Sequence, residues 1–180
     1  MHQRRYSGEV ERLRDPERLA RLEVVRVVEL SLQGISARRL LDVGVGTSVF
    51  AEAFAQRGLR VVGIDVRLEM LTAATEFFPD GYYLLAAAEA LPFRAGAVDV
   101  AFLGLLLHES DDPALAFAEA WRVSTQRVAI LEWPFVEEEH GPPLEHRLTI
   151  GQVQRMAQEV GVGDLHTYHL AHTLLHLADH

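Results

Sequence analysis

Apolar and polar residues change their spacing along the chain in a way that predicts alternating helices and strands. From Asp15 to about Leu32 an apolar residue recurs at every third or fourth position, which predicts an amphipathic helix. Residues 39–43 form a short, mostly apolar run without alternation, as expected of a buried parallel strand. Similar runs occur at residues 60–64, 82–86, 98–103 and 127–133. Further helices are expected at residues 47–57, 68–78, 113–123 and 149–160.

Helix-capping residues and turns support these boundaries and extend the prediction to the C-terminus. Asp15-Pro16 and Thr149 begin helices, and Gly161 follows the last helix. Residues 164–170 and 173–177 predict two strands joined by a very short connection, which favours an antiparallel hairpin. We therefore expect one domain, with a helical N-terminal part (1–34) and an α/β core (36–178). The sheet should be largely parallel, with helices on both faces and the hairpin at one edge.

The net charge and the lengths of the apolar runs limit which partners the protein could bind. The 180 residues carry a formal charge of −9, which argues against a nucleic-acid partner because phosphate contacts need a basic surface. A small neutral, cationic or hydrophobic substrate fits this charge better. No apolar run is long enough for a membrane span, and no signal peptide is evident. We expect a cytoplasmic monomer or homodimer without a membrane partner.

Three residue types are absent from the chain, namely Cys, Lys and Asn. The absence of Cys excludes disulfides, zinc–thiolate sites and cysteine nucleophiles. An Arg-only basic set suits a thermophile, but a high genomic GC content produces the same bias, so both interpretations stay open.

The chemistry concentrates in a glycine turn after the first strand. Leu40 to Thr47 reads as strand and turn, and residues 61–65 follow as a second strand ending in Asp65. A dinucleotide fingerprint needs a small third residue, but Val49 stands there. The missing Lys excludes a phosphate-binding loop and the Tyr-x-x-x-Lys pair of nicotinamide dehydrogenases.

Asp42-Val43-Gly44-Val45-Gly46-Thr47 resembles the first motif of class I S-adenosylmethionine-dependent methyltransferases. Asp65 matches the acidic end of that family's second strand, and residues 88–93 and 98–102 resemble its segment around the fourth strand. The chain is similar to the methyltransferase type 11 domains of ubiquinone and menaquinone C-methyltransferases. The resemblance implies a three-layer α/β/α, Rossmann-like sheet of seven strands. It also implies methyl transfer from S-adenosylmethionine to a small molecule, with S-adenosylhomocysteine as product.

The resemblance assigns a set of cofactor-binding residues: Asp42, Gly44, Gly46, Ser48, Asp65, Val66, Ala88, Glu89 and Leu105. Asp65 would accept hydrogen bonds from the ribose hydroxyls, while Ala88 and Val66 would lie against adenine. Ser48 replaces the usual third glycine and is expected to narrow the space near the methionine moiety. Ala87 replaces a frequent aspartate. These two departures leave open an alternative, a non-catalytic protein that binds S-adenosylmethionine or S-adenosylhomocysteine.

His108 and Glu132 are the candidate catalytic residues, because both follow strands at the carboxyl rim of the sheet. His108 could act as a general base, or it could cap a helix or line the pocket without moving a proton. Glu132 could select or deprotonate the substrate, or pair with an Arg. The Asp/Asn-Pro-Pro-Tyr/Phe signature of amino methylation is absent, so N-methylation has no motif support.

Residues 136–148 form a long, polar, proline-containing connection, which predicts either a lid over the substrate or a solvated loop. We expect Trp133, His146 and Arg147 to contact the substrate, together with Tyr6 in the N-terminal segment. The C-terminal histidines 166, 169, 172, 176 and 180 would share one face of a helix, but the segment reads as strand. We therefore expect no metal site.

Overall fold

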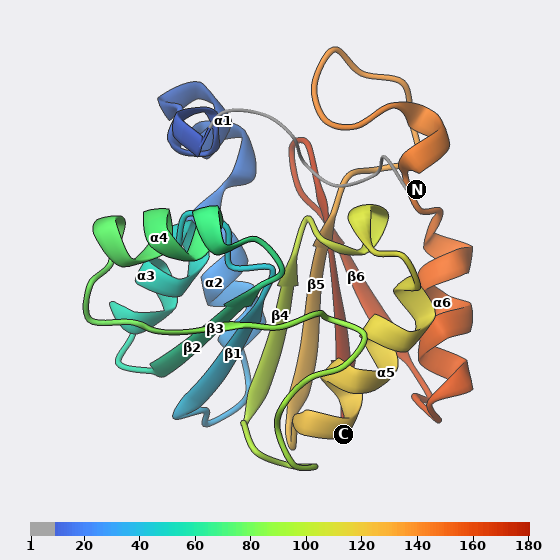
Figure 1. The fold of residues 1–180 in the computed structure, drawn as a ribbon. Coiled ribbons are helices and arrows are strands. Elements are labelled where there is room, and N and C mark those ends of the chain that lie inside the picture. Colours follow the sequence, from blue (N-terminus) through green and yellow to red (C-terminus); the bar gives the residue numbers. More distant parts are fainter. Residues whose placement is uncertain (1–9) are drawn as a thin grey trace.

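The computed structural model describes residues 10–180 and shows one seven-stranded sheet between two layers of helices (Figure 1). The strands are β1 (Arg39–Val43), β2 (Arg60–Asp65), β3 (Tyr82–Leu85), β4 (Val100–Gly104), β5 (Arg127–Glu132), β6 (Leu165–His169) and β7 (Leu174–Asp179). Their order is β3-β2-β1-β4-β5-β7-β6. Strands β1 to β5 pair in parallel, whereas β7 is antiparallel to β5 and β6. The predicted mostly parallel sheet with an antiparallel C-terminal hairpin is confirmed.

Helices cover both faces of this sheet. α2 (Val24–Leu32), α3 (Val49–Ala55) and α4 (Leu68–Phe77) lie on one face, and α5 (Pro113–Val123) and α6 (Ile150–Glu159) lie on the other (Figure 1). Because side chains alternate along a strand, the buried residues form two separate clusters. Phe102 packs against Phe50 and Phe54 on the first face, and Phe117 and Ile130 belong to the second.

The connection between β3 and β4, residues 86–99, contains no helix or strand. It is held against α5 instead. Glu119 accepts a hydrogen bond from the amide of Leu91 at 2.8 Å, and Arg122 donates to the carbonyls of Phe93 and Leu91. Parallel strands are usually connected by a helix. Here these side-chain contacts hold the irregular connection in place instead.

The N-terminal helix differs from the prediction of one continuous helix. It is divided into α1 (Pro16–Leu22) and α2, and Glu23 between them adopts a left-handed conformation with φ of 46°. The Glu23 carboxylate accepts a hydrogen bond from the Ala171 amide at 2.7 Å. Asp15 caps α1 as predicted, and the short helix η1 (Val10–Arg14) precedes it. The break allows η1 and α1 to turn over the carboxyl ends of the strands.

The C-terminal histidines lie on strands and a turn, as the sequence indicated, rather than on a helix. His166 and His169 are exposed on β6, His176 is buried on β7, and His180 stacks on Trp121. Among residues 10–180, no group of three acidic, His or Cys side chains has an arrangement that could hold a metal ion. Over the same residues, none of the helices is long and apolar enough to cross a membrane.

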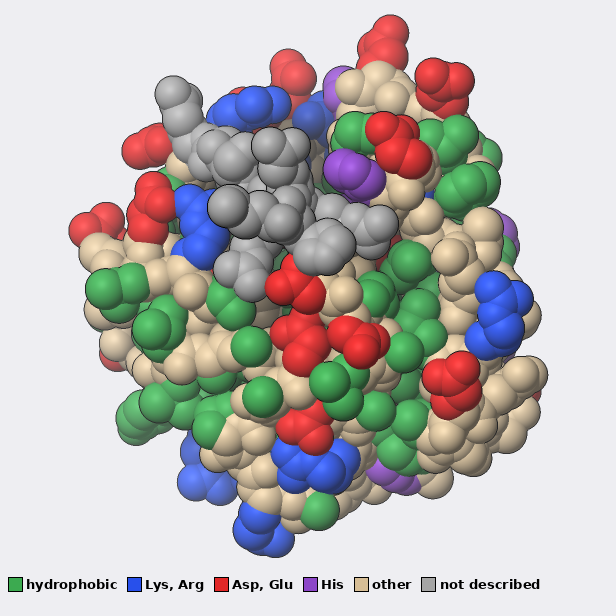
Figure 2. All heavy atoms as spheres, turned by 45° about the vertical axis from the view of Figure 1, so that its right-hand side comes forward, with side chains coloured by type: hydrophobic (Ala, Val, Ile, Leu, Met, Phe, Trp, Pro, Cys, Tyr) green, Lys and Arg blue, Asp and Glu red, His purple; other side chains and the backbone are tan. Residues whose placement is uncertain are grey.

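The acidic excess of the chain is unevenly distributed over its surface. Figure 2 shows one face, on which Asp and Glu side chains group near the middle while the Arg side chains lie in separate places around them. The net charge of −9 therefore does not give the charge of any single part of the surface.

Candidate active site

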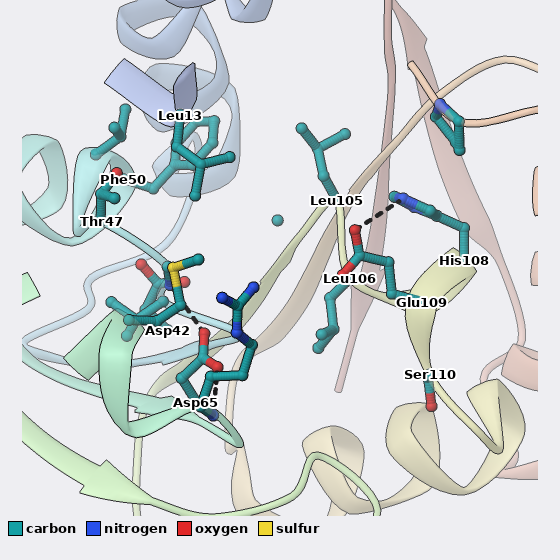
Figure 3. A pocket seen from close by; sticks show the side chains of 18 of the residues that line it. Leu13, Asp42, Thr47, Phe50, Asp65, Leu105, Leu106, His108, Glu109 and Ser110 are labelled. Carbon is teal, nitrogen blue, oxygen red and sulfur yellow. Dashed lines mark hydrogen bonds and ion pairs between the residues drawn. The ribbon is translucent and has the colours of Figure 1, made fainter. Parts of the chain in front are cut away.

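A cavity of about 590 Å³ opens at the carboxyl ends of β1, β2 and β4, within the size range of small-molecule sites. Figure 3 shows Asp42 and Asp65 on one side of it and Leu105, His108 and Glu109 on the other. Loops after the strands form its floor, and residues of η1 and α1 form another wall. Open α/β sheets bind ligands at this edge, so the position agrees with the prediction.

The glycine turn after β1 contributes backbone to the cavity. Gly44 and Gly46 both have positive φ, at 75° and 51°. The amides of Gly44 and Val45 donate to the carbonyl of Ile64, which ties the turn to β2. A side chain at Gly44 would place its Cβ 2.8 Å from Leu106. Glycine is therefore required here both for the backbone conformation and for space.

Ser48 corrects one prediction. It has a φ of 64°, the left-handed conformation for which glycine is best suited, but its side chain is fully buried and does not line the cavity. Its hydroxyl donates to the Tyr83 hydroxyl at 2.9 Å, and Tyr83 donates to the carbonyl of Phe78. Ser48 thus joins α3 to β3 and α4, because its side chain points into the fold. The direction of the side chain gives no support to the predictions that Ser48 binds the cofactor or narrows its space.

Two carboxylates meet at the floor of the cavity. Burial raises the pKa of Asp42 to about 7; an amide hydrogen bond from Ala51 opposes the shift and the charge of Asp65 adds to it. Asp65 accepts hydrogen bonds from the amides of Arg67 at 2.9 Å and Gly46 at 3.2 Å. Burial also raises the pKa of Asp65. Two acidic side chains in one partly dry cavity favour a ligand with a positive charge.

The segment after β3 forms the adjoining wall. Ala88 and Glu89 line the cavity, and so does Val66 beyond β2. Glu89 accepts hydrogen bonds from the Ser110 hydroxyl and from the Asp111 amide, which links this wall to the loop before α5. Eight of the nine residues assigned to the cofactor line this one cavity, with Ser48 as the exception.

Leu105, at the end of β4, has an uncommon conformation. Its φ is 57°, although it is neither Gly nor Asn, and its amide donates to the carbonyl of Leu131 at 2.8 Å. Strained residues of this kind gather at functional sites, because the surrounding structure must hold them in place. The turn leads into the short helix η2 (Leu107–Glu109), which points His108 into the cavity.

His108, in the cavity wall, forms a buried pair with Glu132 behind it. The Nδ1 of His108 donates to Glu132 at 2.7 Å, and the His108 Nε2 lies 3.6 Å from the carboxylate of Glu109. Burial lowers the pKa of His108, but the charge of Glu132 and the bonds to both carboxylates outweigh it and raise the pKa to about 10. The raised pKa favours the protonated imidazole at neutral pH, which counts against the general-base interpretation.

Glu132 also differs from both of its predicted roles. Its side chain is 1% exposed, lies outside the cavity lining, and pairs with His108 rather than with a substrate or an Arg. Because β5 is completely buried, a carboxylate at its end needs a partner inside the protein, and His108 provides it. Glu132 thus positions and charges the imidazole.

The loop after β5 is held in place by Arg147. Its buried guanidinium donates to the carbonyls of Pro134, Val136, His140 and Pro142. Arg147 was predicted to contact the substrate, but its donors bond within the loop and it does not line the cavity. His146 does not line the cavity either. This arrangement favours a preformed wall over a mobile lid. Trp133 lines the cavity as expected.

Several cavity residues were not foreseen. They include Arg12, Leu13, Arg18, Arg21, Phe50, Met70 and His140. The arginines lie on an amphipathic segment that reads as an ordinary solvated helix, and only the break at Glu23 turns them toward the cavity. Tyr6 lies outside the described residues.

Comparison with known proteins agrees with this architecture. The chain is 31% identical over 117 residues to the demethylmenaquinone methyltransferase of Renibacterium salmoninarum, covering 65% of this chain and 49% of that protein. It is 34% identical over 93 residues to a malonyl-[acyl-carrier protein] O-methyltransferase of Serratia marcescens, covering 52% and 36%. The chain thus spans about half the length of these relatives or less.

A crystal structure of an S-adenosylmethionine-dependent methyltransferase from Aquifex aeolicus has a similar fold. Its TM-score is 0.79 at 22% identity, covering 94% of this chain and 96% of that one. The family model described as a methyltransferase domain matches residues 41–130, from β1 to β5, which include the glycine turn, Asp65 and His108. The chain therefore belongs to the methyltransferase domain family.

Proposed function

We propose that this protein transfers a methyl group from S-adenosylmethionine to a small-molecule acceptor. One observation carries the proposal: a glycine turn with positive φ, the buried carboxylate of Asp42 and the half-buried carboxylate of Asp65 face the same cavity in a methyltransferase fold. A sulfonium nucleoside carries a positive charge and no phosphate, so it suits this acidic floor. A pyrophosphate would be repelled by it.

The residues of the cavity fit such a cofactor. Asp65 would accept hydrogen bonds from the ribose hydroxyls, and the backbone of Gly44 and Gly46 would allow close approach of the methionine part. Val66 and the backbone of Ala88 would lie against adenine. When bound, S-adenosylmethionine supplies an electrophilic methyl group on a positively charged sulfur.

The remaining cavity residues would orient the acceptor and keep water away. Methyl transfer depends mainly on the alignment of the reacting atoms, so a general base is not essential. His108, protonated and held by Glu132, would donate a hydrogen bond rather than accept a proton. Leu105, Phe50 and Trp133 supply the apolar surface.

The alternative of a non-catalytic binding protein loses its main support. It rested on Ser48, Ala87 and the lack of an obvious base. Neither side chain lines the cavity, and methyl transfer does not require a base. We therefore propose turnover rather than binding alone.

Calorimetry with S-adenosylhomocysteine and NAD tests the cofactor. We expect binding of S-adenosylhomocysteine but not of NAD, and Asp65→Ala should weaken it by about 10- to 100-fold, as for the loss of charged hydrogen bonds. Asp80→Ala, at an exposed turn, is the matched control. Unchanged affinity in Asp65→Ala would show that the cofactor is placed wrongly. A methyl-transfer screen over quinols, carboxylates and small amines then tests turnover.

A further inference from the structure

Arg21, at the end of α1, brings a guanidinium to the cavity wall that is only partly satisfied within residues 10–180. It lines the cavity, and its side chain is 22% exposed. Its Nε is buried and has no hydrogen-bond partner among those residues. Its Nη1 lies 3.9 Å from Glu17, whose side chain is 87% exposed and solvated. A buried guanidinium N–H without an acceptor is costly, so this position is suited to an anionic ligand.

Most of the charged side chains that line the cavity from the η1–α1 segment are basic, although the chain is acidic. Arg12 and Arg18 line the cavity from the same short η1–α1 segment. The carboxylates of Asp42, Asp65 and Glu89 belong to the other wall, at the ends of β1 and β2 and after β3. Glu109 and Glu139 also line the cavity, but Glu109 faces His108 and Glu139 belongs to the loop after β5. Asp15, the cap of α1, also lines the cavity from the η1–α1 segment, and Arg67 lines it near Asp65. Basic groups are thus in excess on the η1–α1 wall and acidic groups in excess on the other.

The position of Arg21 separates it from the proposed nucleoside site. Glu23, two residues on, is bonded to the amide of Ala171 in the turn between β6 and β7. This bond places the end of α1 toward the β6–β7 side of the sheet, whereas Asp65 and Ala88 lie at the β2–β3 side. Arg21 therefore lies toward the end of the cavity left for the acceptor.

We propose that the methyl acceptor binds as an acid, with a carboxylate or phenolate oxygen held by Arg21. This inference rests on the proposed function and names its substrate class. The planar guanidinium presents paired donors that match a carboxylate. An acidic acceptor differs from the neutral, cationic or hydrophobic substrate that the net charge of the whole chain led us to expect. Arg21 is then a residue that determines specificity.

The test compares acids with their uncharged amides on the protein saturated with S-adenosylhomocysteine. Benzoate is paired with benzamide and octanoate with octanamide, and binding is followed by calorimetry and ligand-observed NMR. We expect at least one acid to bind about ten-fold or more tightly than its amide. Arg21→Gln should abolish that preference and Arg21→Lys should keep part of it. Arg26→Gln, at an exposed arginine of α2, should change nothing. Thermal melts confirm that each variant is folded.

Arg21 could instead bind the carboxylate of the cofactor's own methionine part. Comparing the affinities for S-adenosylhomocysteine, which has this carboxylate, and methylthioadenosine, which lacks it, tests that alternative. We expect both to stay within about two-fold in Arg21→Gln. Weaker binding of S-adenosylhomocysteine alone would mean that Arg21 holds the methionine carboxylate, which overturns the proposal. So would equal or undetectable binding of acids and amides. If S-adenosylhomocysteine does not bind the wild-type protein, the proposed function fails, and the acid–amide comparison can still be made without it.

Discussion

The Nδ1 of His108 lies 2.7 Å from a carboxylate oxygen of Glu132, and the two side chains are 4% and 1% exposed. The residues are 24 positions apart: His108 lies in η2 after β4, and Glu132 is the last residue of the neighbouring strand β5. Glu132 also accepts a hydrogen bond from the backbone amide of His108 at 3.3 Å. The carboxylate therefore sets both the orientation and the charge of the imidazole.

Glu132→Gln removes the negative charge and keeps the shape of the side chain. We expect the pKa of His108 to fall well below its value of about 10, because Glu132 is the main cause of its increase. Nitrogen chemical shifts of the imidazole ring report this directly. The wild-type ring should remain protonated at pH 8, and the variant ring should be neutral; a protonated ring in the variant would contradict the assignment.

The same pair makes stability depend on pH. Folding raises the pKa of His108 from 6.5 to about 10, so its contribution is fully present below pH 6.5 and is lost as the pH rises toward 10. The wild-type free energy of unfolding should therefore fall by an additional amount, on the order of a few kcal/mol, over this range relative to Glu132→Gln. Urea unfolding at pH 6, 8 and 10 measures it.

Gly44→Ala tests the turn, with Gly58→Ala as its control. Both glycines have positive φ, and each Ala should cost about 1–2 kcal/mol through the backbone. Only Gly44 has a neighbour, Leu106, within 2.8 Å of the new Cβ, whereas Gly58 has none within 4 Å. Gly44→Ala should therefore lose roughly 1–3 kcal/mol more and weaken S-adenosylhomocysteine binding. Equal effects of the two changes would count against a close approach at Gly44.

Ser48 separates backbone conformation from side-chain bonding. Ser48→Ala keeps the strained φ of 64° and loses the bond to Tyr83, which should cost about 1 kcal/mol. Ser48→Gly loses the same bond but relieves the strain, so its stability should be close to wild type. Neither variant should change S-adenosylhomocysteine affinity beyond about two-fold, since Ser48 lies outside the cavity. A large change in affinity would restore Ser48 to the binding site.

Arg147→Met should loosen the loop after β5. Four carbonyls lose their donor, and we expect a destabilisation of about 2–4 kcal/mol together with faster proteolysis between residues 134 and 146. Arg155→Met, at an exposed position of α6, is the control. Limited proteolysis with mass spectrometry locates the cleavage; cutting outside this loop would show that Arg147 acts elsewhere.

Asp42 makes cofactor affinity depend on pH. Its pKa is raised from 3.8 to about 7, so the folded protein disfavours the ionised carboxylate, which predominates only above pH 7. The sulfonium of S-adenosylmethionine should benefit from that charge, and the neutral sulfur of S-adenosylhomocysteine should not. The ratio of their affinities should rise between pH 6 and 8 and stay flat in Asp42→Asn. Calorimetry with both ligands at each pH is the measurement.

Most of the fold was predictable because its signals are local. The apolar runs of β1, β2 and β4 and the capping residues Asp15 and Thr149 each act within one helix or strand. The break at Glu23 was not predictable, because the bond that accompanies it joins residues 148 positions apart. The helical spacing continues through the break without any sign of it.

The site divides in the same way. The cofactor wall was predictable because Gly44, Gly46 and Asp65 form a contiguous motif whose conformation follows from residue type. Ser48 stood in the same motif and was misplaced, because a residue's position in a turn does not tell which way its side chain points. Its partner, Tyr83, comes from another strand.

Residue type and periodicity are properties of neighbouring residues in the chain, and they are sufficient for the element order, the parallel sheet and the family. The charge of His108, the internal role of Arg147 and the exposure of Arg21 to the cavity depend on groups that only folding brings near. Burial and partner distance determine whether a charged side chain ionises, bonds to the backbone or faces a ligand. Those quantities exist only in the tertiary structure, so the chemistry of the acceptor end of the cavity was decided there.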